Sequence, residues 1–173
     1  PLFAFISRLV PQKGLDLIRA AENDLKNCNA DFVFLGSGNS DYENLLIWLS
    51  NNSANIRAYI GYRGDLANQI YGGSDFFLMP SKFEPCGLSQ LIAMRYGSLP
   101  VVRATGGLED TVTGYPLADS TGFKFWGYNG WDMMSAVNCA SSVYKDKYTF
   151  NAMRKSAMEA DFSWMKSSEQ YLN

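Results

Sequence analysis

The 173-residue sequence contains no histidine and only three cysteines. Without histidine, no Ser-His-Asp or Cys-His nucleophile system can form within this chain. The cysteines, Cys28, Cys86 and Cys139, are odd in number and widely spaced, which fits a reducing compartment better than a disulfide framework. The same scarcity of thiol and imidazole ligands argues against a structural zinc site.

Long apolar runs and excess positive charge are also missing. No uninterrupted apolar run approaches the roughly 20 residues of a membrane span, and no basic-then-apolar signal peptide opens the chain. A net charge of -2 argues against general binding to nucleic acids or anionic membranes. The remaining composition, 47% hydrophobic and 18% charged, is that of a folded globular protein, and the length suits one domain over residues 1–173. Because the chain opens directly in a strand pattern, we expect it to be part of a larger protein.

Strand and helix patterns alternate along the sequence. Short apolar runs predict strands over 2–6, 31–35, 56–60, 75–79 and 99–103, with an edge strand over 122–126. Helical spacing predicts helices over 14–27, 41–51, 66–71, 87–96, 131–144, 151–160 and 163–172. Alternation with short connections requires a crossover between neighbouring strands, so the predicted fold class is α/β, a three-layer Rossmann-like domain with a parallel doubly wound sheet.

The stretch from Met79 to Met94 organises the rest of the chain. Pro80 and Pro85 exclude both a continuing strand and an early helix, so Glu84 lies on a loop between a buried strand and a helix N-terminus. Open α/β sheets bind ligands at this edge, and the N–H groups of a helix's first turn favour an anion. We expect five loops to gather at the same edge: 7–13, 36–38, 61–64, 81–87 and 104–107.

The side chains on these loops suit a sugar nucleotide. Arg8 and Lys13 can neutralise a diphosphate, and the glycine turns let backbone N–H groups approach it closely. Tyr62 offers a flat face for a base, and Glu84 can accept hydrogen bonds from sugar hydroxyls.

Simpler interpretations remain for each residue. Arg8 and Lys13 fit a solvated surface pair, Glu84 a helix cap, Tyr62 rim packing and Cys86 a packing role. Gly36-Ser37-Gly38 lacks the third glycine of a dinucleotide fingerprint. No Asp-x-Asp pair offers a cage for a phosphate-bridging metal. One aromatic cluster fits either a glucan-stacking surface or core and edge packing: Phe123, Phe125, Trp126, Tyr128 and Trp131.

Four stretches in this order resemble the bacterial glycogen synthase and plant starch synthase family. They are Ser7–Asp16 (SRLVPQKGLD), Ile60–Tyr62 (IGY), Phe83–Leu91 (FEPCGLSQL) and Thr105–Val112 (TGGLEDTV). The terminal Phe162-Ser163-Trp164 is similar to that family's ending. The resemblance implies one half of a GT-B fold, namely the C-terminal donor-binding domain, whose N-terminal acceptor domain is absent from this chain.

The resemblance also implies an activity. Members of the family transfer glucose from ADP-glucose to the non-reducing end of an α-1,4-glucan, with retention and without a metal or other cofactor. It implies a cytoplasmic location, or a plastid in a plant. Because the family's N-terminal Lys-Val-Gly-Gly-Leu motif and cleft histidine are absent, we expect this chain alone to bind nucleotide weakly and to turn over poorly or not at all.

Site residues carry over from the matching motifs. By resemblance, Arg8 and Lys13 hold the diphosphate and stabilise departing ADP, Tyr62 stacks near the adenine, and Glu84 binds the donor glucose. The distal phosphate meets the amides of Gly87 and Leu88 and the hydroxyl of Ser89, a position where many relatives carry Thr. The sugar side is lined by Thr105, Gly106 and Gly107.

One departure concerns Ile92. Related retaining glycosyltransferases carry a second glutamate eight residues after the first, and Ile92 stands at that position here, as in the glycogen and starch synthases. Two alternatives remain open: a non-catalytic nucleotide- or carbohydrate-binding module, and a glycosyltransferase of the wider retaining group that acts on a lipid or small acceptor.

Overall fold

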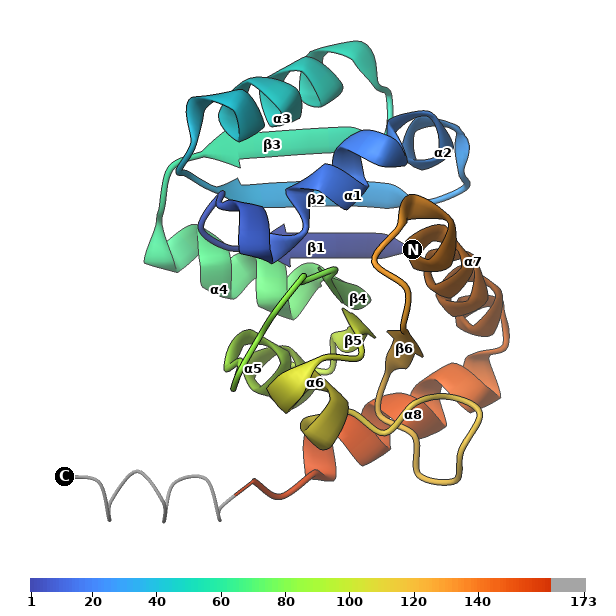
Figure 1. The fold of residues 1–173 in the computed structure, drawn as a ribbon. Helices are drawn as coiled ribbons and strands as arrows, with labels where there is room; N and C mark the ends of the chain where they lie inside the picture. Colours follow the sequence, from blue (N-terminus) through green and yellow to red (C-terminus); the bar gives the residue numbers. More distant parts are fainter. Residues whose placement is uncertain (163–173) are drawn as a thin grey trace, which may run out of the picture.

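The computed structural model describes residues 1–162, in which six parallel strands form one sheet in the order β3-β2-β1-β4-β5-β6 (Figure 1). The strands are β1 (Leu2–Ile6), β2 (Asp31–Gly36), β3 (Ile56–Ile60), β4 (Phe76–Met79), β5 (Leu99–Arg103) and β6 (Phe123–Phe125). The order reverses direction between β1 and β4, as in a doubly wound fold. The predicted α/β class with a parallel sheet is therefore confirmed.

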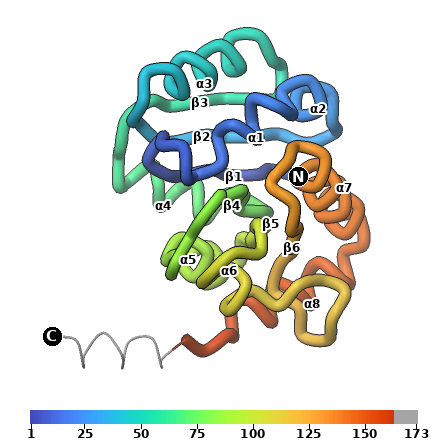
Figure 2. Tube along the Cα trace, viewed as in Figure 1, coloured from blue at the N-terminus to red at the C-terminus, as the bar shows by residue number. Residues whose placement is uncertain are grey.

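Helices cover both faces of this sheet. They are η1 (Pro11–Lys13), α1 (Leu15–Ala20), α2 (Glu22–Asn27), α3 (Ser40–Asn52), α4 (Gly64–Gly73), α5 (Ser89–Arg95), α6 (Gly106–Thr111), α7 (Gly130–Lys145) and α8 (Lys147–Glu159). Figure 2 shows the blue-to-cyan first part of the chain beside the green-to-red remainder, with β1 and β4 where the two parts meet.

Alternation along the strands divides the core into two clusters. Successive strand residues point to opposite faces. Phe3 therefore enters the cluster beneath α1, α2, α3 and α7, whereas its neighbour Ala4 enters the cluster beneath α4, α5 and α6. Phe3 lies in register with Phe32 and Phe76, and its ring stacks on theirs at centroid distances of 5.2 and 4.8 Å. These rings tie the central strands of both halves together.

Several predicted elements need correction. The helix predicted over 14–27 is interrupted at Ala21, while its apolar spacing continues across the break. The helix predicted over 66–71 runs from Gly64 to Gly73 because α4 tolerates its terminal glycines. The predicted loop 104–107 leads directly into α6, which the sequence patterns missed. The helix predicted from 87 begins at Ser89.

The aromatic cluster divides in the structure. Phe123 and Phe125 are buried in the core, so they cannot form an exposed sugar-stacking surface. Trp126 and Trp131 are exposed, at 63% and 82%. The predicted helix over 163–172 and most of the Phe162-Ser163-Trp164 ending lie outside the described residues.

The structure also bears on the predicted lack of a membrane span. No helix within residues 1–162 is long and apolar enough to cross a membrane.

Candidate functional site

Two adjoining cavities lie where the strand order reverses, at the carboxyl ends of β1 and β4. Their volumes are about 450 and 210 Å³, and they share four lining residues: Ile6, Ser7, Arg8 and Ser89. The crevice at such a reversal is where open α/β sheets hold ligands. The predicted gathering of loops at this edge is confirmed for the loops that contribute Ser7, Ser37, Tyr62 and Ser81.

Arg8 is presented by a loop whose neighbours are fixed. Leu9 is fully buried, and its N–H donates to the Ser37 carbonyl at 2.8 Å. The Ser7 N–H donates to the Leu35 carbonyl at 3.1 Å. Between these anchors the Arg8 side chain is exposed, lines both cavities and has no ion-pair partner among residues 1–162. Its charge is therefore available to an anion in the crevice.

The loop after β1 is packed directly against the loop after β4. The Lys82 N–H donates to the Gln12 carbonyl at 2.9 Å. Gly14 has a φ of 85°, and a Cβ there would stand 2.0 Å from the Pro80 carbonyl oxygen. Only glycine permits both this left-handed backbone and this approach, so Gly14 sets how closely the two loops meet.

This contact brings Lys13 and Glu84 together. Lys13 Nζ donates to Glu84 Oε2 at 2.8 Å, and the two side chains are only 20% and 12% exposed. The buried Ser81 hydroxyl donates to the same oxygen at 3.4 Å. Among the described residues, Glu84 Oε1 accepts no hydrogen bond from a side chain, so it keeps its capacity as an acceptor.

The glycine pair after β5 fixes the Glu84 loop from the other side. The Gly107 N–H donates to the carbonyls of Glu84 and Pro85 at 3.0 and 3.1 Å. A Cβ on Gly107 would stand 1.8 Å from the Cys86 carbonyl oxygen, and one on Gly106 would stand 2.2 Å from that of Glu84. These glycines and Thr105 do not line either cavity. Their visible contribution is to support the loop that carries Glu84.

Helix α5 closes the floor of the crevice. Leu88 is its N-cap and Ser89 its first residue, and Gly87 precedes it with a φ of 69°. The first N–H groups of any helix lack partners within it. Those of α5 follow the Glu84 loop directly, and the Ser89 side chain lines both cavities.

Gln90 is a supporting residue that sequence reasoning missed. It is fully buried, and its Nε2 donates to the Cys86 and Gly87 carbonyls and to Thr111 Oγ1, at 3.3, 3.0 and 3.1 Å. It therefore joins the turn before α5 to helix α6. Its position in an apolar helical pattern gave no signal, because a buried amide is indistinguishable in sequence from a surface one.

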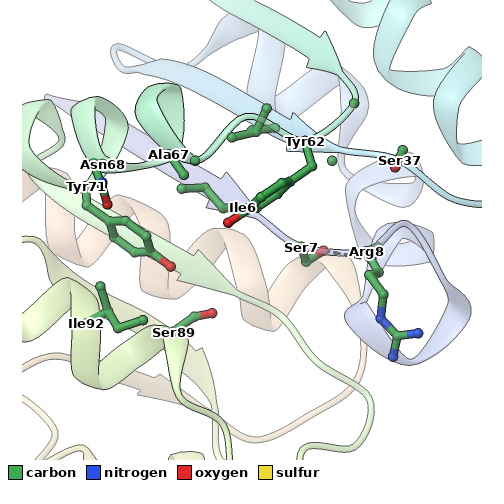
Figure 3. A pocket seen from close by; sticks show the side chains of 14 residues that line it. Ile6, Ser7, Arg8, Ser37, Tyr62, Ala67, Asn68, Tyr71, Ser89 and Ile92 are labelled. Atoms are coloured by element: carbon green, nitrogen blue, oxygen red, sulfur yellow. Dashed lines mark hydrogen bonds between the residues drawn. The ribbon is translucent and has the colours of Figure 1, made fainter.

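The larger cavity has a cationic end and an aromatic end (Figure 3). Arg8 stands at one end, and Asn68 and Tyr71 of α4 stand at the other. Tyr62, which is 78% exposed, lies across the cavity from Ile92 and Ser89. Ile92 thus gives an apolar wall where a second glutamate would have placed a charge.

Tyr71 and Asn68 are further lining residues that the sequence analysis did not single out. Burial raises the pKa of the Tyr71 hydroxyl, and a hydrogen bond with the Ser89 side chain partly opposes that rise. Tyr71 therefore stays protonated at neutral pH and can donate beside Ser89. The helical spacing of Ala67, Ile70 and Tyr71 indicates a face that packs on the core. The sequence therefore did not predict that the Tyr71 hydroxyl would line a cavity.

Most of the predicted site residues therefore share one crevice. Arg8, Lys13, Tyr62 and Ser89 line its cavities, and Glu84 reaches it through Lys13. The exposed Leu88 side chain, Gly87 and residues Thr105 to Gly107 lie outside the cavity linings. Within residues 1–162, no group of three or more His, Cys, Asp or Glu side chains is placed to hold a metal ion.

Comparison with known proteins gives consistent matches. Residues 1–151 match the family described as glycosyl transferases group 1. The chain is 48% identical to a glycogen synthase of Exiguobacterium sibiricum, over 99% of this chain and 36% of that protein. It is also 48% identical to a glycogen synthase of Clostridium acetobutylicum, over 100% of this chain and 37% of that protein.

A solved structure agrees with these matches. The catalytic domain of Starch Synthase IV from Arabidopsis thaliana, bound to ADP and acarbose, superposes with a TM-score of 0.87 and 37% identity. The match covers 99% of this chain and 37% of that one. The chain thus spans little more than a third of the length of the relatives it matches.

Proposed function

This chain belongs to the glycosyl transferases group 1 family, and on that premise we propose that it is the donor-binding half of a glycogen or starch synthase. In this proposal the complete protein transfers glucose from ADP-glucose to the non-reducing end of an α-1,4-glucan, with retention. A further N-terminal domain of the same polypeptide supplies the acceptor side of the cleft. The proposal is supported by the glycogen synthase relatives and by the starch synthase structure with bound ADP.

One geometric observation carries the proposal. Arg8 is common to both cavities, with the aromatic slot of Tyr62 on one side and the Lys13–Glu84 pair on the other. A base in the slot, a diphosphate at Arg8 and a sugar at Glu84 follow the order of groups in a sugar nucleotide. The sequence match alone does not provide this spatial order.

The charges fit the bond that must break. As the anomeric C–O bond breaks, positive charge develops on the sugar ring and negative charge on the leaving diphosphate. Lys13 is held by its ion pair with Glu84, and the backbone on either side of Arg8 is held by its loop, so both cations stand at the crevice before the reaction and can stabilise the developing anion. Because two cations and the amides of Gly87 and Leu88 neutralise ADP in this scheme, it calls for no metal ion.

Lys13 and Glu84 contact different parts of the donor in this proposal. The ammonium has three N–H donors, so Lys13 can keep its bond to Glu84 Oε2 and still donate to a phosphate oxygen. Glu84 Oε1 then accepts from hydroxyls of the donor glucose. Each group thereby orients the other, and the sugar and the diphosphate are positioned by one ion pair.

The apolar side chain of Ile92 suits the part of the larger cavity that would hold the nucleotide base. Tyr62 and Ile92 face each other across the larger cavity, and a flat adenine packs between such surfaces. Asn68 and the Tyr71 hydroxyl lie at the end of the cavity opposite Arg8 and can bond polar atoms at the base edge.

Nucleotide binding tests this proposal. Calorimetric titration of the full chain with ADP, UDP and ADP-glucose should show ADP and ADP-glucose binding more tightly than UDP. Arg8→Ala should weaken ADP binding by roughly 10- to 100-fold, since it removes one charge-assisted contact of about 1.5–3 kcal/mol. Arg19→Ala is the matched control, because Arg19 is an exposed arginine that lines neither cavity.

Two results would contradict the assignment. Tighter binding of UDP than of ADP would overturn the choice of donor. Equal ADP affinity in Arg8→Ala and Arg19→Ala would remove Arg8 from the diphosphate site.

A further inference from the structure

A third cavity of about 380 Å³ lies between α2 and α7, away from the crevice. Its seven lining residues are Asp24, Asn27, Cys28, Trp131, Met134, Ser135 and Asn138. None of them lines either cavity of the crevice. Figure 1 shows α2 and α7 on the side of the molecule that bears the N-terminus. The volume falls within the roughly 300–1,000 Å³ of ligand sites.

Trp131 dominates this cavity. It is 82% exposed, although its indole is a large apolar surface whose burial is favourable. Its backbone is firmly held, because Asn129 caps α7 by accepting from the Asp132 N–H at 2.8 Å and Ser135 Oγ donates to the Trp131 carbonyl at 3.0 Å. A rigid helix thus presents an open aromatic face.

The polar groups of the lining are small and mostly uncharged. Asn27 Nδ2 donates to the Asn23 carbonyl at 2.7 Å, which leaves its Oδ1 directed to other donors. The Asn138 side chain makes no hydrogen bond within residues 1–162. Asp24 supplies one carboxylate, and no lysine or arginine lines the cavity. This set disfavours phosphates and suits a neutral ligand rich in hydroxyls.

Aromatic faces combined with amide and carboxylate groups are the chemistry that recognises sugars. The C–H face of a pyranose packs on a flat ring, while its hydroxyls bond to Asn and Asp side chains. The apolar floor at Met134, which is buried, and Cys28 extends the ring contact. A peptide or a second copy of this chain would gain less here, because Trp131 is the one large exposed apolar side chain among the seven.

We propose that the α2–α7 cavity is a second, non-catalytic binding site for an α-1,4-glucan chain, with Trp131 as its stacking platform. The choice of an α-glucan rests on the proposed function, whereas the carbohydrate chemistry rests on the cavity itself. Such a site holds the polymer to the protein while the crevice acts on another part of it.

Native electrophoresis of the full chain in gels with and without glycogen tests the site, with maltoheptaose as a soluble competitor. Wild-type protein should be retarded by glycogen, and Trp131→Ala should weaken this apparent affinity at least tenfold. Asn138→Ala should weaken it roughly two- to tenfold, as expected for one hydrogen bond. Circular dichroism of each variant verifies that it is folded.

Two matched variants isolate the cavity. Tyr148 is an exposed aromatic residue and, like Trp131, the second residue of a helix with a side-chain N-cap. Tyr148→Ala should therefore leave retardation by glycogen unchanged. Glu84→Gln alters the crevice and should also leave it unchanged. Retardation of Trp131→Ala equal to wild type would overturn the inference.

Other outcomes separate this inference from the proposed function. Trp131-dependent retardation in a chain that fails to bind ADP would support this site and refute the donor site. Normal ADP binding without any retardation of the wild-type chain by glycogen would support the donor site and refute the α2–α7 site. Competition by cellohexaose as strong as by maltoheptaose would overturn the α-glucan assignment. A change in oligomeric state of Trp131→Ala in light scattering would show that a second copy occupies the face instead.

Discussion

The two halves of the sheet contribute opposite chemistry to the crevice between them. The half built from β1, β2 and β3 provides the cations Arg8 and Lys13 and the ring of Tyr62. The half built from β4, β5 and β6 provides the carboxylate of Glu84 and the hydroxyl of Ser89. Neither half holds a complete site. The proposed function would therefore depend on the few contacts that join the loop after β1 to the loop after β4.

The halves also differ in how their loops are supported. The Arg8 loop is held by backbone bonds to the neighbouring loop at Ser37. The Glu84 loop is held by the Gly107 N–H and the buried Gln90 side chain. Both loops also depend on close glycine contacts, since a Cβ on Gly36 would stand 2.0 Å from the Ser7 carbonyl oxygen and one on Gly107 would stand 1.8 Å from the Cys86 carbonyl oxygen. The difference between them is the buried Gln90 side chain, so substitutions at Gln90 should weaken the Glu84 loop and leave the Arg8 loop intact.

The largest expected effect comes from Gly14→Ala, at the contact between the halves. The substitution places a Cβ 2.0 Å from the Pro80 carbonyl and forces alanine into a φ of 85°. We expect a loss of roughly 3 kcal/mol or more in the free energy of unfolding, from backbone strain plus overpacking. Urea unfolding followed by circular dichroism measures it.

Gly73→Ala is the control for this change. Gly73 ends α4, and a Cβ there would meet no heavy atom within 4 Å. Its replacement should be neutral or stabilising by up to about 1 kcal/mol. If Gly14→Ala lies within 0.5 kcal/mol of Gly73→Ala, in the range of ordinary surface substitutions, the two halves are not held together at this point.

The Lys13–Glu84 pair should show a large effect on rate and a smaller one on stability. In the complete enzyme, Lys13→Met should lower kcat by roughly 10²–10³, as for loss of one preorganised donor. Because the pair is mostly but not fully buried, its loss should cost roughly 1–2 kcal/mol of stability, between surface and buried pairs.

A double-mutant cycle separates these effects. Lys13→Met with Glu84→Gln should recover part of the lost stability, since no unpaired carboxylate remains, but none of the lost rate. Recovery of rate in the double variant would mean that the pair serves only to join the halves.

The smallest effect concerns helix starts. α1 to α4 have no side-chain cap, whereas the side chains of Asn129 and Asp146 cap the N-termini of α7 and α8. Hydrogen bonds from Thr149 hold the pKa of Asp146 below its ordinary value. The ionised Asp146 therefore stabilises the folded protein fully above the ordinary Asp pKa near 4. This stabilisation is lost as the pH falls through the lower pKa that Asp146 has in the folded state.

Melting temperatures at pH 7 and at about pH 2.5 test this dependence. Asp146→Asn should melt roughly 1–2 °C below wild type at pH 7, and this gap should shrink in acid. Asn129→Ala should lose about 1 kcal/mol at both pH values, because an amide cap does not titrate. An unchanged gap for Asp146→Asn in acid would contradict the assignment.

The sequence predicted the regular parts of the fold well and the contacts of the site only in part. The strands 2–6, 56–60 and 99–103 match the structure. For 2–6 and 99–103 the reason is that a buried parallel strand is a short apolar run. α6 was missed because Gly106 and Gly107 suggested a loop, although both are needed for the close approach to the Glu84 loop. The sequence could not show that the Glu84 loop leaves no room for a Cβ at these two positions.

Arg8, Lys13 and Glu84 could be nominated together because strand order places their loops at one edge. Gln90 and Tyr71 could not, because their roles depend on which groups surround them after folding. Asn138 and Trp131 belong to α7, away from the predicted site, and their cavity is completed by residues of α2 that lie more than 100 positions earlier in the sequence. Pairings between distant elements were beyond the patterns of a single sequence.

The strand order has a consequence for synthesis of the chain on the ribosome. β1 can pair with β2 soon after both have emerged, but its other neighbour, β4, follows much later: the Leu2 N–H donates to an Asp75 carboxylate 73 residues further along the sequence. Until then the nascent three-stranded sheet carries a bare, phenylalanine-rich strand on its open border. Unpaired borders of this kind recruit other chains, so the chain should be most prone to aggregate in the interval before β4 is synthesised.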